Sequence, residues 1–342
     1  MMDKYFTKVD VEDTGWRISY KDKIMMLGSC FSENIGEKFQ QLKFQVDINP
    51  FGVIYNPLSI AKSIRRLLAG KDYTTEDLFE HQGIWGSFDH HSRFSSTSAD
   101  QTLEKINGRL GLSRAFLKEA GYLILTFGTA WAYELKQTGE VVSNCHKLPE
   151  SGFKRFRLTP GEITDVYREL LSSLWIFNPG LKVIFTVSPI RHRKDGANGN
   201  QLSKAVLLLA ADRLVTGYGK EHCAYFPSYE IVMDELRDYR FYNPDMIHLN
   251  EQAVNHIWDR FSPVLIGENS LALSNSIRKI MRAKEHRPFH PDSEHYKNFL
   301  LDNLNEINDL AGRFPELNLQ EEKHFFEHEL QKYHQKSLEN RT

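Results

Sequence analysis

The most regular feature of the chain is an alternation between short apolar runs and longer segments in which apolar residues recur every three or four positions. A short apolar run has the length of a strand buried on both faces, whereas the three-to-four spacing is typical of an amphipathic helix. Strands that alternate with helices predict an α/β fold, a three-layer sandwich whose mostly parallel sheet of about five strands carries helices on both faces. The runs lie at residues 24–27, 46–48, 122–127, 183–187 and 224–226.

Capping residues mark the starts of several expected helices. Pro57 is expected to open the helix after the second run, because proline is favoured at the first helical position. Thr159 is a suitable cap for a helix that runs to about Trp175, and Asn250 for a helix at the end of the alternating region. A further helix is expected over about 202–215.

Two regions interrupt this alternation. Residues 71–120 are less regular, and we expect only short helical stretches there. The segments 131–135 and 141–143 flank Gly139 and predict a hairpin inserted after the third strand.

The amino-acid composition changes near the C-terminal end of the sequence. From about residue 271, His, Lys, Glu and Asn dominate and apolar positions become sparse. We therefore expect one α/β domain over residues 20–265, followed by a helical, partly solvated extension over residues 266–342 that could serve as an interaction arm.

The composition of the chain limits the kinds of partner and compartment that we expect. The net charge of −2 gives no electrostatic reason to expect nucleic acid or an anionic membrane surface. The three cysteines are odd in number and show no metal-ligand spacing, so we expect reduced thiols in a cytoplasmic protein. No apolar run approaches the ~20 residues of a membrane span. The stretch 27–30 resembles a lipoprotein cleavage site, but the charged residues 20–23 before it argue against a signal peptide.

Ser29 is the first candidate for chemistry. It follows a predicted strand at a small-residue turn and precedes a helix with a stripe at Phe31, Ile35 and Phe39. Such a turn exposes a hydroxyl next to the N–H groups of a helix N-terminus, which suit a developing oxyanion. The alternative is that Ser29 only caps this helix, a common use of serine.

Asp245 and His248 supply the partners that a serine nucleophile needs. A carboxylate three residues before a histidine can hold the imidazole Nδ1 and leave Nε2 to accept the serine proton. Gly52, after the second predicted strand, can offer its N–H to an oxyanion without side-chain obstruction, although it is equally suited to a plain turn.

Taken together, these motifs resemble the SGNH/GDSL hydrolase superfamily and, within it, the GSCFA family. The resemblance spans roughly residues 20 to 262 and implies a flavodoxin-like sandwich. The stretches that carry it are Gly-Ser-Cys-Phe at 28–31, Asn-Pro-Phe-Gly at 49–52, Ser-Phe-Asp-His-His-Ser at 87–92, Phe-Gly-Thr-Ala-Trp at 127–131, Asn-Cys-His-Lys at 144–147, Ser-Pro-Ile-Arg-His at 188–192 and Asp-Met-Ile-His at 245–248.

The resemblance implies a nucleophile at Ser29, a general base at His248 and an orienting carboxylate at Asp245, with the amides of Ser29 and Gly52 as oxyanion donors. The sequence departs from the superfamily in two places. The acid of the usual Gly-Asp-Ser is absent before Ser29, and the asparagine that completes the oxyanion hole has no match after the third strand. Thr129 or Asn144 could substitute for that donor.

Several further residues are candidates for the substrate cleft. His90 and His91 could line it, and we consider a metal site there less favoured because adjacent residues of an extended segment point in opposite directions. His146 could face the cleft or make structural contacts, and Arg191 could bind an anionic group or simply lie on the surface. His192 could contact substrate or act as an alternative base. Separately, Cys30 is expected to be a buried core thiol.

These features predict a serine esterase that removes a small acyl group from a carbohydrate or other polyol through an acyl-serine intermediate. No cofactor or metal is implied, and the expected partner is a small-molecule or glycan ester, with no nucleic acid and no membrane insertion. The alternative is a non-catalytic or weakly active binding module that keeps the cleft. The oligomeric state is left open.

Overall fold

The five predicted strands form one sheet in the computed structural model, which describes residues 7–339. In space their order is β10-β9-β5-β1-β2, and β1 with β5, β5 with β9, and β9 with β10 pair in parallel. The register aligns Leu27, Leu125, Phe185 and Tyr225 across the sheet. The strands are β1 (Lys23–Gly28), β2 (Gln45–Ile48), β5 (Ala120–Phe127), β9 (Lys182–Val187) and β10 (Cys223–Phe226).

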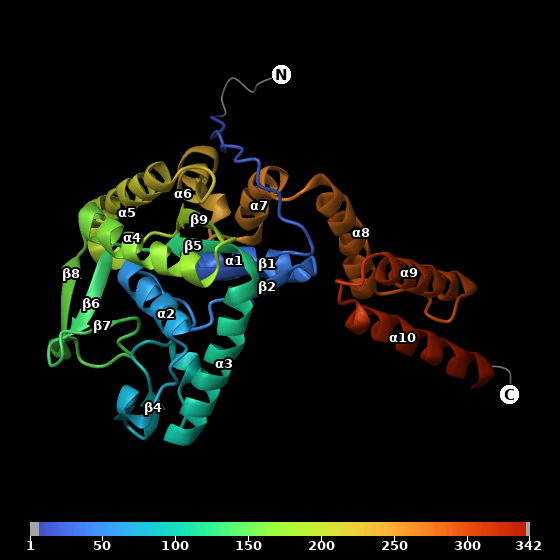
Figure 1. Cartoon of the computed structure of the whole chain (residues 1–342). Helices are drawn as coiled ribbons and strands as arrows, with labels where there is room; N and C mark the ends of the chain where they lie inside the picture. The colour runs from blue at the N-terminus through green and yellow to red at the C-terminus, as the bar shows by residue number, and fades with distance from the viewer. Residues whose placement is uncertain (1–6, 340–342) are drawn as a thin grey trace. The chain divides into compact units, whose positions relative to one another are not determined.

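Alternate residues of these strands point to two different layers of helices. Leu27, Leu125 and Phe185 belong to one core, which they share with helices α2 to α5. Their neighbours face the other layer, where Thr126 bonds Ser32 of α1. Figure 1 shows β1, β5 and β9 enclosed by helices, as the predicted three-layer sandwich requires. The first layer comprises α2 (Pro57–Ala69), α3 (Ala99–Glu119), α4 (Pro160–Phe177) and α5 (Gly196–Tyr218); the second comprises α1 (Cys30–Gln41), α6 (Ser228–Glu230) and α7 (Glu251–Leu265).

The expected caps are present where the sequence placed them. Pro57 is the first residue of α2, after the cap Asn56. Thr159 forms a capping box with Glu162 at the start of α4. Asn250 Oδ1 accepts the N–H of Ala253 in the first turn of α7.

The prediction of only short helical stretches in residues 71–120 is wrong, because α3 is an unbroken helix of 21 residues. Its buried face is narrow and includes Ile106, Leu110 and Leu117 together with the small polar Thr102 and Ser113. A stripe diluted by polar residues has weak periodicity, so packing on the sheet rather than the local pattern stabilises this helix. Before it, β3 (Phe79–His81) and β4 (Ile84–Gly86) form a small antiparallel pair.

The hairpin predicted around Gly139 is present, but it is part of a three-stranded sheet with the order β7-β6-β8. Its strands are β6 (Trp131–Leu135), β7 (Val141–Val142) and β8 (Phe153–Arg157). The strand β8 was not predicted, because its Phe-Lys-Arg-Phe-Arg sequence has only two apolar residues among three cations. Single turns of helix complete the chain, five of them 3-10 at Thr75–Asp77, Ser92–Phe94, Glu150–Gly152, Arg193–Asp195 and Tyr239–Phe241, and one π-helical at Ile231–Glu235.

The chain divides into two compact units. Of the described residues, one unit is formed by 7–16, 23–37 and 46–265 and contains nearly all of the sheet and its helices. The other unit combines residues 17–22 and 38–45, which include the end of α1, with 266–339. The second unit contains the helices α8 (Glu268–Glu285), α9 (Glu294–Arg313) and α10 (Gln320–Glu339), with Ile277, Leu300 and Phe326 fully buried. No helix within residues 7–339 has the length and apolar character needed to cross a membrane.

Candidate active site

The strand order defines where a ligand is expected. The chain passes from β1 to β2 on one side of β1 and then crosses to β5 on its other side. In doubly wound sheets the crevice for ligands lies outside the carboxyl ends of the strands at such a switch point. Here those ends are Gly28-Ser29 after β1 and Gly128-Thr129 after β5.

Gly28 shapes the turn from β1 into α1. Its φ of +149° is accessible to few side chains, and a Cβ there would lie 2.3 Å from the carbonyl oxygen of Thr126. The Gly28 N–H donates to Asn49 Oδ1 at 2.9 Å, which ties the end of β1 to the residue after β2. Only glycine therefore allows the strand to turn so closely against its neighbour.

Ser29 directly precedes α1 at this turn. It is 1% exposed, so the prediction that the turn exposes its hydroxyl is wrong. Its Oγ accepts the N–H of Phe31 at 3.3 Å, so the hydroxyl caps the helix, as the alternative interpretation of this serine predicts. The first N–H groups of a helix have no intrahelical partner. Of those at the start of α1, the Phe31 N–H bonds the Ser29 hydroxyl, whereas the Ser32 N–H donates to the Ser29 carbonyl at 2.8 Å.

A pocket of about 520 Å³ opens at this edge of the sheet. Cys30, the residue after Ser29, is part of its wall, together with the aromatic residues Tyr55 and Trp131. Six of the residues predicted for the site also line it, namely His91, Thr129, Asn144, Arg191, His192 and His248. Residues distant in sequence therefore meet at the carboxyl ends of β1, β5 and β9.

Asp245 and His248 form the pair that their spacing predicts. Asp245 Oδ2 lies 2.6 Å from His248 Nδ1, and its Oδ1 accepts the N–H groups of Ile247 and His248 at 2.8 and 2.9 Å. These hydrogen bonds, that from His248 first, lower the pKa of Asp245 to about 2. Asp245 is therefore a carboxylate at neutral pH, and it fixes the orientation of the His248 ring.

The candidate oxyanion donors differ in how far they are already engaged. The Gly52 N–H donates to the Asn49 carbonyl at 2.7 Å, and a Cβ on Gly52 would lie 2.2 Å from the Cβ of His91. Thr129 Oγ1 lies 3.1 Å from Ser203 Oγ. Asn144 Oδ1 accepts the N–H of His146 at 2.8 Å, and no partner for its Nδ2 is found among residues 7–339. Among the candidate side-chain donors of the described chain, Asn144 Nδ2 is therefore the one not already engaged in a hydrogen bond.

The structure places His90 and His146 outside the pocket wall. His90 is 2% exposed, and its ring packs against Phe51 and Tyr73 with centroids 5.0 and 4.9 Å away. Burial lowers the pKa of His90 to about 3, so its ring is neutral. His146 Nε2 lies 2.9 Å from the Ser87 carbonyl oxygen, so both histidines make structural contacts. The described residues hold no group of three or more His, Cys, Asp or Glu side chains suited to a metal ion.

Cys30 and His192 both lie in the pocket wall. The prediction of a core thiol is wrong, because Cys30 is partly exposed there, and burial, followed by the nearby Glu33, raises the pKa of its thiol. Burial and then the Lys204 cation lower the pKa of His192 to about 4. A pKa this low makes the ring a weak proton acceptor, so His192 is better suited to hydrogen bonding with substrate than to serving as the base.

Lys204 is a buried lysine that was not among the predicted site residues. It is 1% exposed, and its Nζ donates to the carbonyls of Gly128 and Ser188 at 2.7 and 2.6 Å, one after β5 and one after β9. Burial lowers the pKa of Lys204 to about 7. The sequence did carry a signal, since Asn200, Lys204, Leu207 and Ala211 recur at helical spacing and are all buried on α5.

An ion pair between Arg155 of β8 and Asp195 holds the loop after β9. The Asp195 side chain is 2% exposed, and the Arg155 guanidinium lies 4.1 Å from the centroid of the Trp131 ring. This pair was also missed, because β8 was not predicted and its partner lies 40 residues further along the chain.

The fold and the position of the pocket define a doubly wound α/β protein with a site at its switch point. Residues 23–261 match the model of the GSCFA family, and residues 277–332 match that of the C-terminal domain of GSCFA domain proteins. The chain belongs to the GSCFA family, as its motifs indicated. The family likeness also extends into the C-terminal helices, beyond the residues from which it was first inferred.

Among solved structures, the chain is similar to a carbohydrate esterase family 3 protein from Talaromyces cellulolyticus, with 11% identity, a TM-score of 0.35 and coverage of 74% of this chain and 98% of that one. It is also similar to the acetyl xylan esterase Est2A from the rumen bacterium Butyrivibrio proteoclasticus, with 11% identity, a TM-score of 0.39 and coverage of 75% and 66%. No curated protein matches the chain.

Proposed function

We propose that this protein is a serine esterase that removes a small acyl group from a carbohydrate or other polyol. The observation that carries the proposal is the 2.6 Å contact between Asp245 and His248, because His248 lines the same pocket as Cys30, the residue next to Ser29. A carboxylate that fixes an imidazole is the arrangement that activates a serine hydroxyl.

In the first half of the proposed reaction, Ser29 Oγ attacks the acyl carbon and His248 Nε2 takes the hydroxyl proton. The tetrahedral oxyanion is stabilised by the first N–H groups of α1, with Asn144 Nδ2 as the candidate side-chain donor. The C–O bond of the ester breaks, His248 returns the proton to the leaving alcohol, and an acyl-Ser29 remains. Water, deprotonated by His248, then attacks the acyl carbon. The bond from this carbon to Ser29 Oγ breaks, the acid leaves, and His248 returns its proton to Ser29 Oγ.

The chemistry of the pocket wall supports a polyol ester as substrate. Tyr55 and Trp131 provide aromatic surface for a ring, and the neutral His192 offers a hydrogen-bonding group. Pockets that combine apolar walls with a few placed polar groups bind small organic ligands in a defined orientation.

The test is hydrolysis of p-nitrophenyl acetate and of acetylated sugars by the wild type and by Ser29→Ala. Removing the nucleophile is expected to lower kcat by at least about 10³-fold, because other groups cannot replace its covalent role. Ser32→Ala is the matched control, since Ser32 is buried in α1 and its hydroxyl bonds Thr126 instead. Equal rates for Ser29→Ala and the wild type would rule out Ser29 as the nucleophile.

A non-catalytic binding module is the second candidate. It is favoured by the engagement of two expected catalytic groups, since the Ser29 hydroxyl caps α1 and the Gly52 N–H bonds Asn49. Fluorophosphonate labelling followed by mass spectrometry separates the two functions. An esterase is labelled at Ser29 and requires His248 for that labelling, whereas a binding module remains unmodified.

A further inference from the structure

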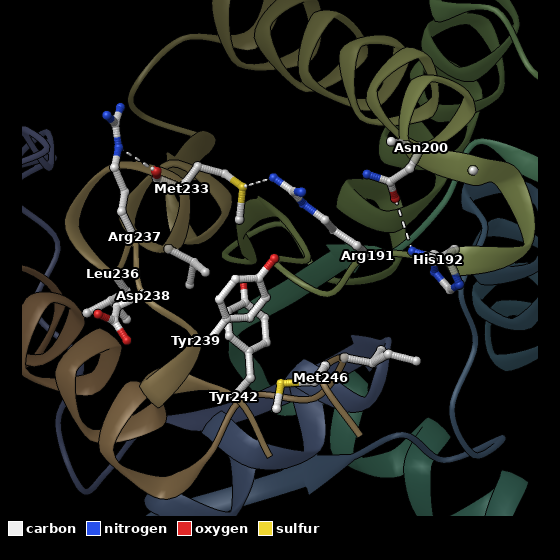
Figure 2. A pocket seen from close by; sticks show the side chains of 14 residues that line it. Arg191, His192, Asn200, Met233, Leu236, Arg237, Asp238, Tyr239, Tyr242 and Met246 are labelled. Atoms are coloured by element: carbon white, nitrogen blue, oxygen red, sulfur yellow. Dashed lines mark hydrogen bonds between the residues drawn. The ribbon is translucent and has the colours of Figure 1, made fainter. Parts of the chain in front are cut away.

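A second pocket of about 470 Å³ adjoins the first and is shown in Figure 2. Three residues, Arg191, His192 and Ile247, line both pockets. The second pocket is otherwise built from the start of α5 and the segment 232–246. A molecule that reaches from one pocket to the other would therefore pass the candidate base, because Ile247 directly precedes His248.

Asn200 of α5 presents an unsatisfied donor in this pocket. The residue is 3% exposed, and its Oδ1 accepts the His192 N–H at 3.0 Å. Within the described chain its buried Nδ2 has no hydrogen-bond partner. Figure 2 shows this nitrogen on the side of Asn200 that faces Arg191. An unpaired buried amide is costly, so an acceptor oxygen from a ligand would be favourable there.

Arg191 presents an uncompensated positive charge beside this amide. Its guanidinium is exposed and donates to Met233 Sδ at 2.9 Å, and a thioether is a weak acceptor. No carboxylate of residues 7–339 forms an ion pair with Arg191. Arg237, which lines the same pocket, is instead paired with Asp234 at 2.6 Å, and Figure 2 shows it pointing away from Arg191.

Two tyrosines provide a surface for a ring. The rings of Tyr239 and Tyr242 lie with centroids 6.3 Å apart, and both line the pocket with Leu236 and Met246. Such faces pack against the C–H surface of a sugar ring and leave its hydroxyls for polar groups. Asp238 also lines the pocket, so a ligand with two negative charges, such as a phosphate monoester, would be repelled more than one with a single charge.

We propose that this second pocket binds the sugar portion of the substrate, and that the sugar carries a carboxylate held by Arg191 and Asn200 Nδ2. The ring lies against Tyr242, and the acyl ester extends past His192 into the first pocket. The assignment of the ester rests on the proposed function, whereas binding of the acidic sugar does not require hydrolysis.

The test is calorimetric titration of the full chain with the methyl glycoside of glucuronic acid and with methyl glucoside, two rings that differ in the carboxylate. The wild type is expected to bind the acidic sugar at least about ten-fold more tightly. Arg191→Gln and Asn200→Asp should each remove most of that preference. Asn200→Asp keeps the oxygen that accepts the His192 N–H and exchanges the donor for a repelling charge. Arg237→Gln is the matched control and should change the affinity less than two-fold, which is about 0.4 kcal/mol.

Equal affinities for the two sugars, or no binding of either at millimolar concentration, would overturn the inference, as would an Arg191→Gln variant with unchanged preference. Titration of Ser29→Ala separates this result from the proposed function. Ser29→Ala could bind the acidic sugar with the same affinity as the wild type, while the wild type hydrolyses no ester. In that case the esterase proposal fails and the pocket assignment stands. If p-nitrophenyl acetate is hydrolysed without any preference for the acidic sugar, only the pocket assignment fails.

Discussion

At the scale of single residues, the geometry around Ser29 depends on the absence of a side chain at Gly28. Gly28→Ala is expected to lower the free energy of unfolding by about 2–4 kcal/mol, because it combines an unfavourable φ of +149° with a Cβ only 2.3 Å from the Thr126 carbonyl oxygen. Urea denaturation followed by circular dichroism measures this loss. Gly83→Ala is the control, since Gly83 also has a positive φ but a Cβ there would meet nothing within 4 Å. Similar losses for the two variants would show that backbone conformation alone is responsible.

The lowered pKa of the buried Lys204 predicts how the free energy of unfolding depends on pH. Its pKa is lowered to about 7 in the folded protein, against about 10.4 for an unfolded lysine. Between these values the unfolded chain binds the proton and the folded chain does not, so the free energy of unfolding rises with pH, by at most about 1.4 kcal/mol per pH unit. Lys204→Met is expected to lack this increment.

Urea midpoints of the wild type and Lys204→Met at pH 6, 8 and 9 test this prediction. The stability of the wild type relative to Lys204→Met should increase from pH 7 upward and be constant below it. Lys154→Met, at a side chain that is 63% exposed, controls for loss of a lysine charge. Parallel pH dependences of the wild type and Lys204→Met would contradict a lowered pKa.

At the scale of elements, the loop after β9 is held by the ion pair between Asp195 and Arg155 and carries Arg191 and His192. Asp195→Asn is expected to raise KM for a sugar ester about ten-fold and to change kcat less, because the loop contributes binding groups and not the nucleophile. Steady-state kinetics measures this split. Glu150→Gln is the control, since Glu150 pairs with the adjacent Lys194 but is 83% exposed. A loss confined to kcat would instead place the loop in the chemical step.

Some elements could be predicted from the sequence and others could not. The five strands and the helices with clear caps could be predicted, because their apolar runs and their capping residues are local signals. The helix α3 and the strand β8 could not, since their stability comes from packing and pairing with distant residues. The candidate site likewise has residues that could be predicted from local sequence and residues that depend on packing. The contact between Asp245 and His248 spans three residues and could be anticipated. The helical spacing of Asn200 and Lys204 is visible in the sequence, but the groups that their donors face are determined only when α5 packs on the sheet.

At the scale of the whole molecule, the second unit is assembled from three separated pieces of chain, and an ion pair joins two of them. Lys43, from the segment 38–45, lies 2.8 Å from Glu322 of α10, whose side chain is fully buried. Lys284 of α8 lies 3.6 Å from the same carboxylate. Glu322 therefore links three elements of one unit through a single buried charge.

Glu322→Gln is expected to destabilise this unit by on the order of 3 kcal/mol, because two partly buried ammonium groups lose their shared counter-charge. Glu321→Gln is a closely matched control, since Glu321 precedes it and pairs with the same Lys284 but is 76% exposed, and exposed pairs contribute at most about 1 kcal/mol. Urea unfolding, followed by hydrogen exchange, shows which residues lose stability in the Glu322→Gln variant. Faster exchange confined to residues 17–22, 38–45 and 266–339, with the sheet unchanged, would show that the two units unfold separately. A loss shared by the strands of the sheet would show that one charge in α10 supports the cooperative unfolding of the whole chain.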